Sequence, residues 1–229
     1  MADSTQGFTY SVDLVLVIDA TGSMASIIER VKKNALAFHE DLQKKMEELG
    51  RHIDSLRVRV IAFRDYYADS APDSLVTSDF FVLPEQSGDY SAFVSNLRAT
   101  GGGDEPETAM EALAEAIRSP WANEGSKQRQ VIIVWTDASA HKLEKNAGSK
   151  PAGYPTDMPA NFDELTDMWE GQEHTNLAWK RLLLYTPDAY PWTDISNNWE
   201  NTLHFTSKAG DGLADTDYGE ILDSIARSV

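Results

Sequence analysis

Residues 13–24 read DLVLVIDATGSM, and this stretch decides the fold. Five apolar residues run without interruption into Asp19, and side-chain hydroxyls follow at Thr21 and Ser23. So unbroken an apolar run predicts a strand from Val12 to Ile18 that is buried on both faces, as in a parallel sheet covered by helices. Three oxygen-bearing side chains then come just after the carboxyl end of that strand.

The rest of the chain alternates apolar segments with helical patterns, which predicts an α/β fold with a mostly parallel sheet flanked by helices. The other expected strands are Leu56–Phe63, Leu75–Leu83 at an edge, Gln130–Trp135, Arg181–Tyr185 and Thr202–Thr206. The expected helices are one long helix from Met24 to Leu49 ended by Gly50, then Tyr90–Leu97, Pro106–Ile117, Asn161–Glu173 and a last one capped by Asp217. Residues 138–160 are expected to form a long loop.

Composition narrows the classes of function. The chain has 229 residues, which suits one domain, and we expect a single domain over 1–229 with its core at about 12–229. With 20 Lys and Arg against 37 Asp and Glu, the net charge is −17. Such a surface repels phosphate backbones and anionic lipids, so we expect neither nucleic-acid nor membrane binding. It suits cations and basic partners.

Cellular location is predicted from what the sequence does not contain. There is no cysteine, which removes disulfides, zinc–thiolate sites and cysteine nucleophiles. The first residues have no basic start followed by an apolar stretch, so residues 1–10 are expected to be a flexible lead and no secretory signal is visible. The longest apolar run is too short to cross a bilayer. A cytoplasmic protein is the expectation.

Three segments rich in oxygen donors are expected at the carboxyl ends of the strands, where ligands gather in open α/β sheets. They are Asp19-Ala20-Thr21-Gly22-Ser23, the loop Gly101–Thr108, and Asp137 after the strand Gln130–Trp135. Alternation in an extended segment would turn residues 19, 21 and 23 to one side. Oxygen ligands without His or Cys suit a hard cation such as Mg²⁺. The alternative is that these residues only cap the following helix.

At these residues the sequence resembles the von Willebrand factor type A domain. DLVLVIDATGSM is similar to that family's D-x-[ST]-x-S motif, the metal-ion-dependent adhesion site, and VIIVWTDA resembles its later strand ending in Thr-Asp. The order of elements agrees over about Val12 to Val229. The resemblance implies a Rossmann-like, doubly wound sheet with one short antiparallel edge strand. It also implies metal-dependent binding of a protein partner and no catalysis.

The resemblance also implies roles for single residues. Thr21 and Ser23 would coordinate Mg²⁺ through their hydroxyls, while Asp19 and Asp137 would act mostly through bound waters. The family usually has a threonine in the second loop, where this sequence has Asp104. Glu107 and Thr108 are the other candidates for that position.

The acidic Asp104 has a physical consequence if it belongs to the site. Three ionised aspartates, at positions 19, 104 and 137, would then surround two positive charges. The metal would be a weaker electrophile toward an incoming carboxylate. We therefore expect the site to bind the metal more tightly when no partner is present and to accept Mn²⁺ or Ca²⁺ as well. We also expect it to bind an acidic side chain of a partner more weakly.

Asp65 and His141 are also expected near the carboxyl ends of the strands. Asp65, after the strand Leu56–Phe63, could support the site from behind, but a cap or a pair with an arginine such as Arg64 fits its position better. His141 is interpreted as a simply exposed loop histidine.

The expected function is a magnesium-dependent protein-binding module, a subunit or adaptor in a multi-protein assembly, in which an acidic side chain of the partner completes the metal's coordination. A metal-dependent phosphatase or phosphoryl-transfer enzyme is the alternative, although Thr21 stands where a haloacid-dehalogenase-type D-x-D motif needs aspartate. The P-loop, GxGxxG and GxSxG patterns are absent. A scaffold with a vestigial metal site is the third possibility.

Overall fold

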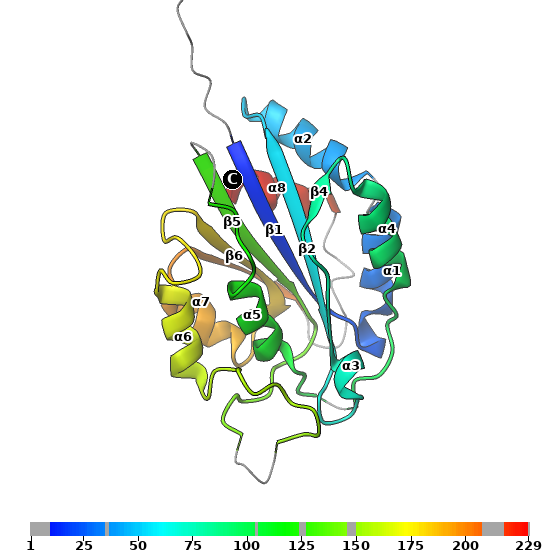
Figure 1. The fold of residues 1–229 in the computed structure, drawn as a ribbon, viewed down its shortest axis with the longest axis vertical. Helices are drawn as coiled ribbons and strands as arrows, with labels where there is room; N and C mark the ends of the chain where they lie inside the picture. The colour runs from blue at the N-terminus through cyan, green and yellow to red at the C-terminus, as the bar shows by residue number, and fades with distance from the viewer. Residues whose placement is uncertain are drawn as a thin grey trace, which may run out of the picture.

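The structure, a computed structural model, describes residues 10–34, 37–103, 105–123, 127–145, 150–207 and 218–228. Within these ranges the strands form one sheet in the order β3-β2-β1-β5-β6-β7, and β4 also pairs with β2. The strands are β1 Tyr10–Asp19, β2 Ser55–Phe63, β3 Leu75–Thr77, β4 Phe81–Leu83, β5 Lys127–Trp135, β6 Lys180–Pro187 and β7 Thr202–Ser207. Figure 1 shows β1, β2 and β5 running side by side through the middle of the molecule.

The decisive stretch is the central strand, as predicted. β1 pairs in parallel with β2 on one side and with β5 on the other, so that Ile18 lies opposite both Ala62 and Trp135. From Val12 to Ile18 no side chain is more than 4% exposed. The sheet order runs outward in opposite directions from β1 and β5, so the carboxyl ends of these two strands mark the topological switch point.

Helices cover both faces of the sheet, which confirms the doubly wound fold. The helical elements are η1 Gly22–Met24, α1 Ala25–Asn34, α2 Phe38–Glu48, α3 Ala71–Ser74, α4 Ser87–Asn96, α5 Ala109–Ile117, α6 Phe162–Glu170, α7 Trp192–Asn198 and α8 Tyr218–Ser228. One apolar core lies between the sheet and α1, α2, α4 and α8. A second lies between the opposite face and α5, α6 and α7, which stand in front of the sheet in Figure 1.

The predicted edge strand is antiparallel but interrupted. Leu75–Leu83 divides into β3 and β4, which both pair antiparallel with β2. Ser78 lies between them and is bound twice by β2: its carbonyl accepts from Arg59 Nε at 2.9 Å, and its hydroxyl accepts from the amide of Val60 at 2.9 Å. These side-chain bonds replace the regular ladder at that point and break the strand.

The long helix predicted from Met24 to Leu49 is divided too. The chain forms η1 and then two helices, α1 and α2, and residues 35 and 36 between them lie outside the described residues. Apolar periodicity continued across this break, so the sequence pattern did not reveal it. Gly50 ends α2 as predicted, with φ of 69°, a backbone conformation that glycine adopts without strain.

The helix predicted from Pro106 begins three residues later, at Ala109. Glu107 instead makes an isolated parallel bridge with Ala140: its amide donates to the Ser139 carbonyl at 3.0 Å, and its carbonyl accepts from the His141 amide at 2.8 Å. The backbone around Glu107 is therefore tied to the loop after β5 and cannot enter the helix. Helices α3 and α7 were not predicted.

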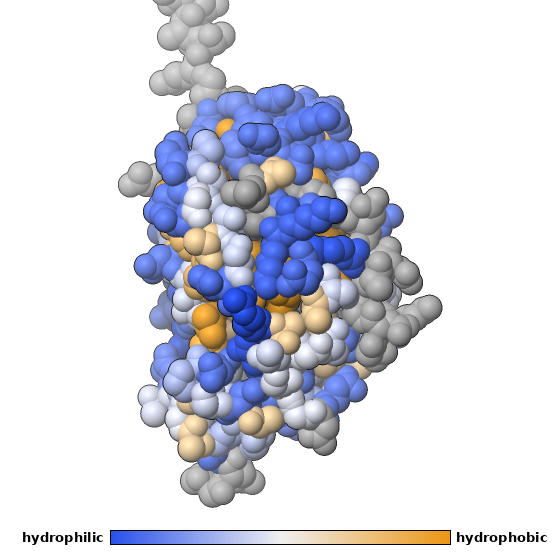
Figure 2. Space-filling model, turned by 90° about the vertical axis from the view of Figure 1, so that its right-hand side faces the viewer, coloured by the Kyte–Doolittle hydropathy of each residue, from blue (hydrophilic) through white to orange (hydrophobic). Residues whose placement is uncertain are grey.

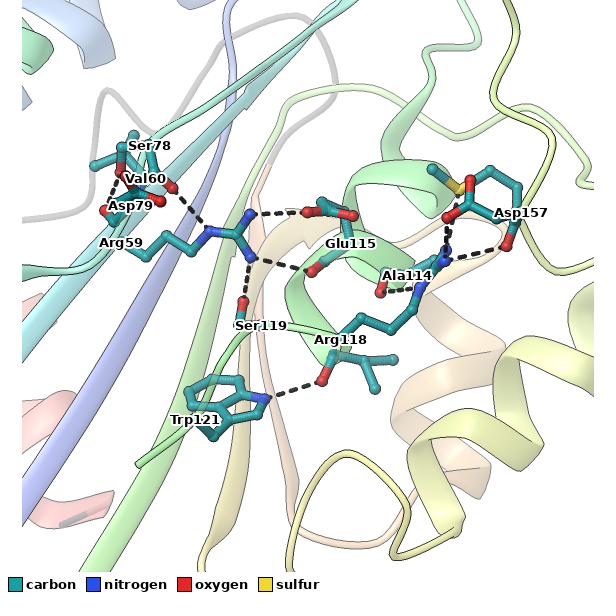
Figure 3. Close-up of polar contacts among 12 residues, drawn as sticks. Arg59, Val60, Ser78, Asp79, Ala114, Glu115, Arg118, Ser119, Trp121 and Asp157 are labelled. Carbon is teal, nitrogen blue, oxygen red and sulfur yellow. Dashed lines mark hydrogen bonds and ion pairs between the residues drawn. The ribbon is translucent and has the colours of Figure 1, made fainter. Parts of the chain in front are cut away.

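Figure 3 shows how α5 is fixed to β2 and to the long loop. The Arg59 guanidinium, on β2, donates to Ser119 Oγ at 2.7 Å and to Glu115 Oε1 at 2.8 Å. One turn away, Arg118 donates to Asp157 Oδ2 at 2.8 Å. These contacts fix the carboxyl end of α5 to β2 and to the long loop.

The surface on the side of α1 and α4 is largely hydrophilic, with small apolar patches between charged residues (Figure 2). No helix of the described residues is long and apolar enough to cross a membrane.

Candidate functional site

A tight turn after β1 brings the side-chain oxygens of residues 19, 21 and 23 together. The sequence predicted instead an extended segment with these side chains on one side. Thr21 is still extended, but Gly22–Met24 form a turn of 3-10 helix. This turn brings Ser23 Oγ to 3.2 Å from Thr21 Oγ1. Asp19 Oδ1 accepts both from the Thr21 amide, at 2.9 Å, and from Thr21 Oγ1, at 2.6 Å. The three predicted side chains do converge.

Asp137 joins the same group from the end of β5. Its Oδ1 accepts a hydrogen bond from Ser23 Oγ at 3.0 Å, across 114 positions of sequence. The neighbouring Thr136 donates from Oγ1 to Asp19 Oδ2 at 2.6 Å. Asp19, Thr21, Ser23 and Asp137 thus form one continuous hydrogen-bonded line at the switch point. Both carboxylate oxygens of Asp19 accept hydrogen bonds, and this carboxylate therefore orients the hydroxyls of Thr21 and Thr136.

Of the three candidates in the second loop, only Glu107 is described at the site. Its side chain lines the cleft described below. Thr108 is turned away: its hydroxyl accepts from the Tyr66 amide at 2.9 Å and lies 3.3 Å from Asp65 Oδ1. Asp104 lies outside the described residues.

These side chains surround an open cleft of about 380 Å³ at the carboxyl ends of β1 and β5. We call it the rim cleft. Its lining residues are Thr21, Gly22, Ser23, Gly101, Gly102, Gly103, Glu105, Glu107, Asp137 and Ala138. Asp19 is completely buried and lies behind this lining.

Gly102 allows the second loop to approach β1 closely. Its φ is 81°, and a Cβ added there would lie 2.7 Å from Thr21 Cγ2 and 2.9 Å from Glu107 Oε1. No side chain fits in that space, so the backbone itself packs against two lining residues. The close contact with Thr21 and Glu107 therefore explains why this loop has a glycine at position 102.

Arg64 holds the rim together through backbone carbonyls, a role that the sequence analysis did not assign. Its Nε donates to the carbonyls of Ala20 at 3.1 Å and Thr100 at 2.8 Å. Its terminal nitrogens donate to the carbonyls of Asp73 and Arg98, each at 2.6 Å. One buried guanidinium therefore joins the end of β1, the glycine-rich loop and the turn before β3. The only signal in the sequence is its place after a buried strand.

Burial and mutual repulsion raise the pKa of two carboxyl groups here. Burial raises the pKa of Asp19 to about 6, against the opposing effect of its bonds from Thr136 and Thr21. Burial also raises the pKa of Glu107 to about 8, and the negative charges of Asp19, Asp65, Asp69 and Asp137 add to that shift. Such crowding of carboxylates without a counter-charge is costly, and a bound cation would remove the cost.

The residues present fit a hard cation. Asp137 Oδ2 and Glu107 Oε2 are buried without a hydrogen-bond partner among the described residues, and both side chains line the rim cleft. Within the described ranges no three acidic or histidine side chains are grouped so as to hold a metal ion by themselves. A site here therefore needs the hydroxyls of Thr21 and Ser23 as ligands, in the all-oxygen chemistry that Mg²⁺ prefers.

Asp65 and His141 lie next to the site and not in it. Asp65 Oδ1 caps its own turn by accepting from the Tyr67 amide at 3.0 Å, as the sequence suggested. His141, interpreted from sequence as simply exposed, lies 3.2 Å from Asp65 Oδ1 with its side chain 23% exposed, and its ring packs on Tyr67 at 4.7 Å between centroids. The histidine is thus part of the packed rim, which corrects the sequence interpretation.

Comparison with known proteins identifies the domain type. The sequence model of the von Willebrand factor type A domain matches residues 13–157. The alpha-protein kinase vwkA of Dictyostelium discoideum is 30% identical over 159 residues, 69% of this chain and 23% of that protein. A putative ariadne-like RING finger protein of Acanthamoeba polyphaga mimivirus is 30% identical over 137 residues, 57% of this chain and 11% of that protein. The chain thus spans a quarter or less of these relatives.

Solved structures show the same fold at lower identity. The pilus adhesin SpaC of Lactobacillus rhamnosus GG matches 97% of this chain and 31% of its own, at 12% identity and a TM-score of 0.58. The vWF domain of the type V pili tip protein Mfa5 of Porphyromonas gingivalis matches over 97% of this chain and 96% of its own, at 15% identity and a TM-score of 0.52. The matched sequence model and the shared fold agree that this chain belongs to the von Willebrand factor type A domain family.

Proposed function

We propose that the rim cleft binds Mg²⁺ and that the domain uses the metal to hold a protein partner. The observation that carries this proposal is the hydrogen-bonded line from Asp19 through Thr21 and Ser23 to Asp137, which faces an open cleft with two unpartnered carboxylate oxygens. Capping of a helix explains neither the contact between segments 114 positions apart nor those free oxygens. Mn²⁺ or Ca²⁺ could occupy the same oxygen set.

The residues divide into two roles. Thr21 and Ser23 would bind the metal through their hydroxyls, and Asp137 would bind it directly or through water. Asp19 would act through water or by orienting Thr21, because both its oxygens already accept hydrogen bonds. The bound ion would supply positive charge at the floor of the cleft, and the chain's own residues would shape the space around it.

In the second loop, Glu107 takes the ligand role in this proposal. Glu107 lines the cleft with a free Oε2, whereas the Thr108 hydroxyl is already bonded to Tyr66. Replacing Glu107 with Gln should therefore weaken Mg²⁺ binding, while Thr108→Val should lower stability and leave the metal affinity nearly unchanged. Asp104 remains a further candidate, and the Asp104→Ala variant tests it in the same titration.

The partner would present an acidic side chain to the metal, and its surroundings would be basic to match a chain of net charge −17. The proposal includes no catalysis. None of the described residues that line the cleft is a lysine or a histidine, which a phosphoryl-transfer site would use to neutralise or protonate the leaving group. A role in a multi-protein assembly fits a module of this kind.

Titration calorimetry with Mg²⁺ tests the metal site. The wild-type chain should bind one ion, and Ser23→Ala and Asp137→Asn should weaken binding about tenfold or more. Ser95→Ala, at an exposed position of α4, should have no effect. If the wild type binds no divalent metal, the domain is a scaffold with a vestigial site.

A pull-down in Mg²⁺ and again in chelator tests the partner. Proteins retained only with metal, and lost with Ser23→Ala, support the proposal. The alternative, a metal-dependent phosphatase, predicts that the purified chain hydrolyses phosphate esters in Mg²⁺ and that Asp19→Ala abolishes this activity.

A further inference from the structure

A second hollow lies at the opposite end of the sheet, where β1 and β5 begin. It has a volume of about 430 Å³, and we call it the basal pocket. Its lining residues are Tyr10, Arg51, Lys127, Gln128, Arg129, Ala178 and Trp179. Tyr10 and Lys127 are register partners at the start of β1 and β5. The ten residues of β1 separate this pocket from the rim cleft by about 30 Å. In Figure 1 these strands begin at the top and end at the bottom.

The basal pocket is basic in a strongly acidic chain. Arg129 and Arg181 lie two residues before Val131 and Leu183, so strand alternation places them on the same face of the sheet. None of the ion pairs among the described residues includes Arg51, Arg129 or Arg181. With 37 acidic residues in the chain, arginines without a carboxylate partner are an exception that needs a reason.

The guanidinium of Arg129 is only partly satisfied by the described residues. Arg129 Nε is buried and has no hydrogen-bond partner among the described residues. The bonds that the arginines do make go to uncharged oxygens. Arg129 donates to the Gln128 carbonyl at 2.8 Å and Arg51 to the Ala226 carbonyl at 3.2 Å. Arg181 donates to the Lys180 carbonyl at 2.6 Å and to Asn201 Oδ1 at 3.3 Å.

The electrostatic effects agree with this geometry. The pKa of the Tyr10 hydroxyl is lowered, first by a hydrogen bond from Lys127 and then by the charges of Lys127, Arg51 and Arg129. The pKa of Arg129 is lowered by burial and by its neighbours Arg181 and Arg51. The described carboxylate in contact with this end of β1 is Asp54, which accepts from the Tyr10 amide at 2.7 Å. The positive charges therefore act on each other.

We propose that the basal pocket binds the dianionic phosphate group of a phosphate monoester. Its donors come from three parts of the chain: Arg51 in the turn after α2, Lys127 and Arg129 at the start of β5, and Trp179 just before β6. A tetrahedral oxyanion with several acceptor oxygens matches such an arrangement, whereas a carboxylate suits a single planar arginine fork. Trp179 offers a ring for an aromatic or heterocyclic part of the ester.

Binding is measured with defined ligands in the presence of chelator. Inorganic phosphate and phenyl phosphate are titrated calorimetrically, with glutarate as the carboxylate probe. Phosphate and phenyl phosphate should bind, and glutarate should bind about tenfold more weakly or not at all. Tighter binding of phenyl phosphate identifies an ester as the source, and equal binding identifies free phosphate. No binding of either phosphate, or tighter binding of glutarate, overturns the proposal.

Variants locate the site. Arg129→Gln and Arg51→Gln should weaken phosphate binding about tenfold, while Arg98→Gln removes the same charge elsewhere and should have no effect. Asp137→Asn should bind phosphate like the wild type, which separates this pocket from the rim cleft. Because Arg129 is repelled by its neighbours, Arg129→Gln should unfold at the same temperature as the wild type or higher without phosphate, so loss of binding cannot be ascribed to misfolding. Equal phosphate affinity in Arg129→Gln and the wild type contradicts the proposal.

Discussion

At the scale of single residues, Thr136 shows how the site depends on a hydroxyl to which the sequence analysis assigned no role. It is fully buried and donates to Asp19 Oδ2 at 2.6 Å. That bond is the largest of those opposing the rise in the pKa of Asp19. Removing it leaves a buried carboxylate with one oxygen unpaired.

We therefore expect Thr136→Val to raise the pKa of Asp19 further and to weaken Mg²⁺ binding at neutral pH. Losing a bond to a charged group corresponds to about 1.5–3 kcal/mol. Calorimetric titration of Mg²⁺ measures the effect. Thr186→Val is the matched control, because Thr186 is equally buried and its hydroxyl lies 3.0 Å from His204 Nε2, away from the cleft. Equal metal affinity in both variants would contradict this role for Thr136.

The raised pKa values of Asp19 and Glu107 predict that the metal-free protein becomes more stable on mild acidification. A carboxyl group whose pKa is higher in the folded state binds its proton more tightly there. Its stabilising effect is present at low pH and is lost as pH rises through the folded pKa, about 6 for Asp19 and about 8 for Glu107. For Asp19 the rise from 3.8 corresponds to at most ~3 kcal/mol.

Urea unfolding in chelator should accordingly give a higher free energy of unfolding at pH 6 than at pH 8. The variant Glu107→Gln should flatten the part of this dependence nearest pH 8. A wild-type free energy of unfolding that is equal at the two pH values, or higher at pH 8, would show that these carboxyl groups are not buried together as described.

At the scale of elements, the close approach of the glycine-rich loop to β1 is tested at Gly102. Gly102→Ala should disturb Thr21 and Glu107 together, because its Cβ would lie within 3.0 Å of both. We expect a loss of about 2–4 kcal/mol in stability and weaker Mg²⁺ binding. Gly50→Ala is the control: φ is 69° there, and nothing lies within 4 Å of the added Cβ. Its cost should be about 1 kcal/mol, with metal binding unchanged.

The contacts that Arg59 makes with α5 give a second prediction at this scale. Arg59 is 7% exposed and binds Ser78, Ser119 and Glu115. Arg59→Leu leaves these partners unsatisfied and should lower the free energy of unfolding by about 1–3 kcal/mol. Urea unfolding measures it, and a double-mutant cycle with Glu115→Gln isolates the ion pair. Additive effects would show that the pair makes no net contribution.

Elements whose signal is local were predictable from sequence, whereas breaks made by tertiary contacts were not. The apolar runs of β1 and β5 could only be buried strands, and both are. The interruption between β3 and β4 depends on Arg59, which reaches Ser78 from another strand. The late start of α5 depends on Glu107 pairing with the loop after β5. No window of sequence contains both partners of either contact.

The same reasoning applies to the site. Asp19, Thr21, Ser23 and Asp137 were predictable because each follows a strand whose end could be read from apolar patterning. That Glu107 and not Thr108 lines the cleft was not predictable, because it depends on which way each side chain turns before α5.

At the scale of the whole molecule, metal binding should raise the free energy of unfolding of the domain. If Mg²⁺ binds only the folded state, a concentration of about one hundred times Kd adds ~2.7 kcal/mol. For a domain of this size that is a rise in Tm of roughly 5–10 °C. Thermal unfolding in Mg²⁺ and in chelator measures it. Ser23→Ala should remove the difference, and a difference that persists in this variant would place the ion elsewhere.

Arg64 gathers four carbonyls from three separate parts of the rim. A lysine in its place has a single nitrogen and cannot reach them all, so even this mild exchange would let the glycine-rich loop drift from the end of β1. Random mutagenesis screened for lost partner capture should therefore recover changes at Arg64 as often as at Ser23. Such mutants would look like defects of recognition, although the residue they alter touches neither ion nor partner.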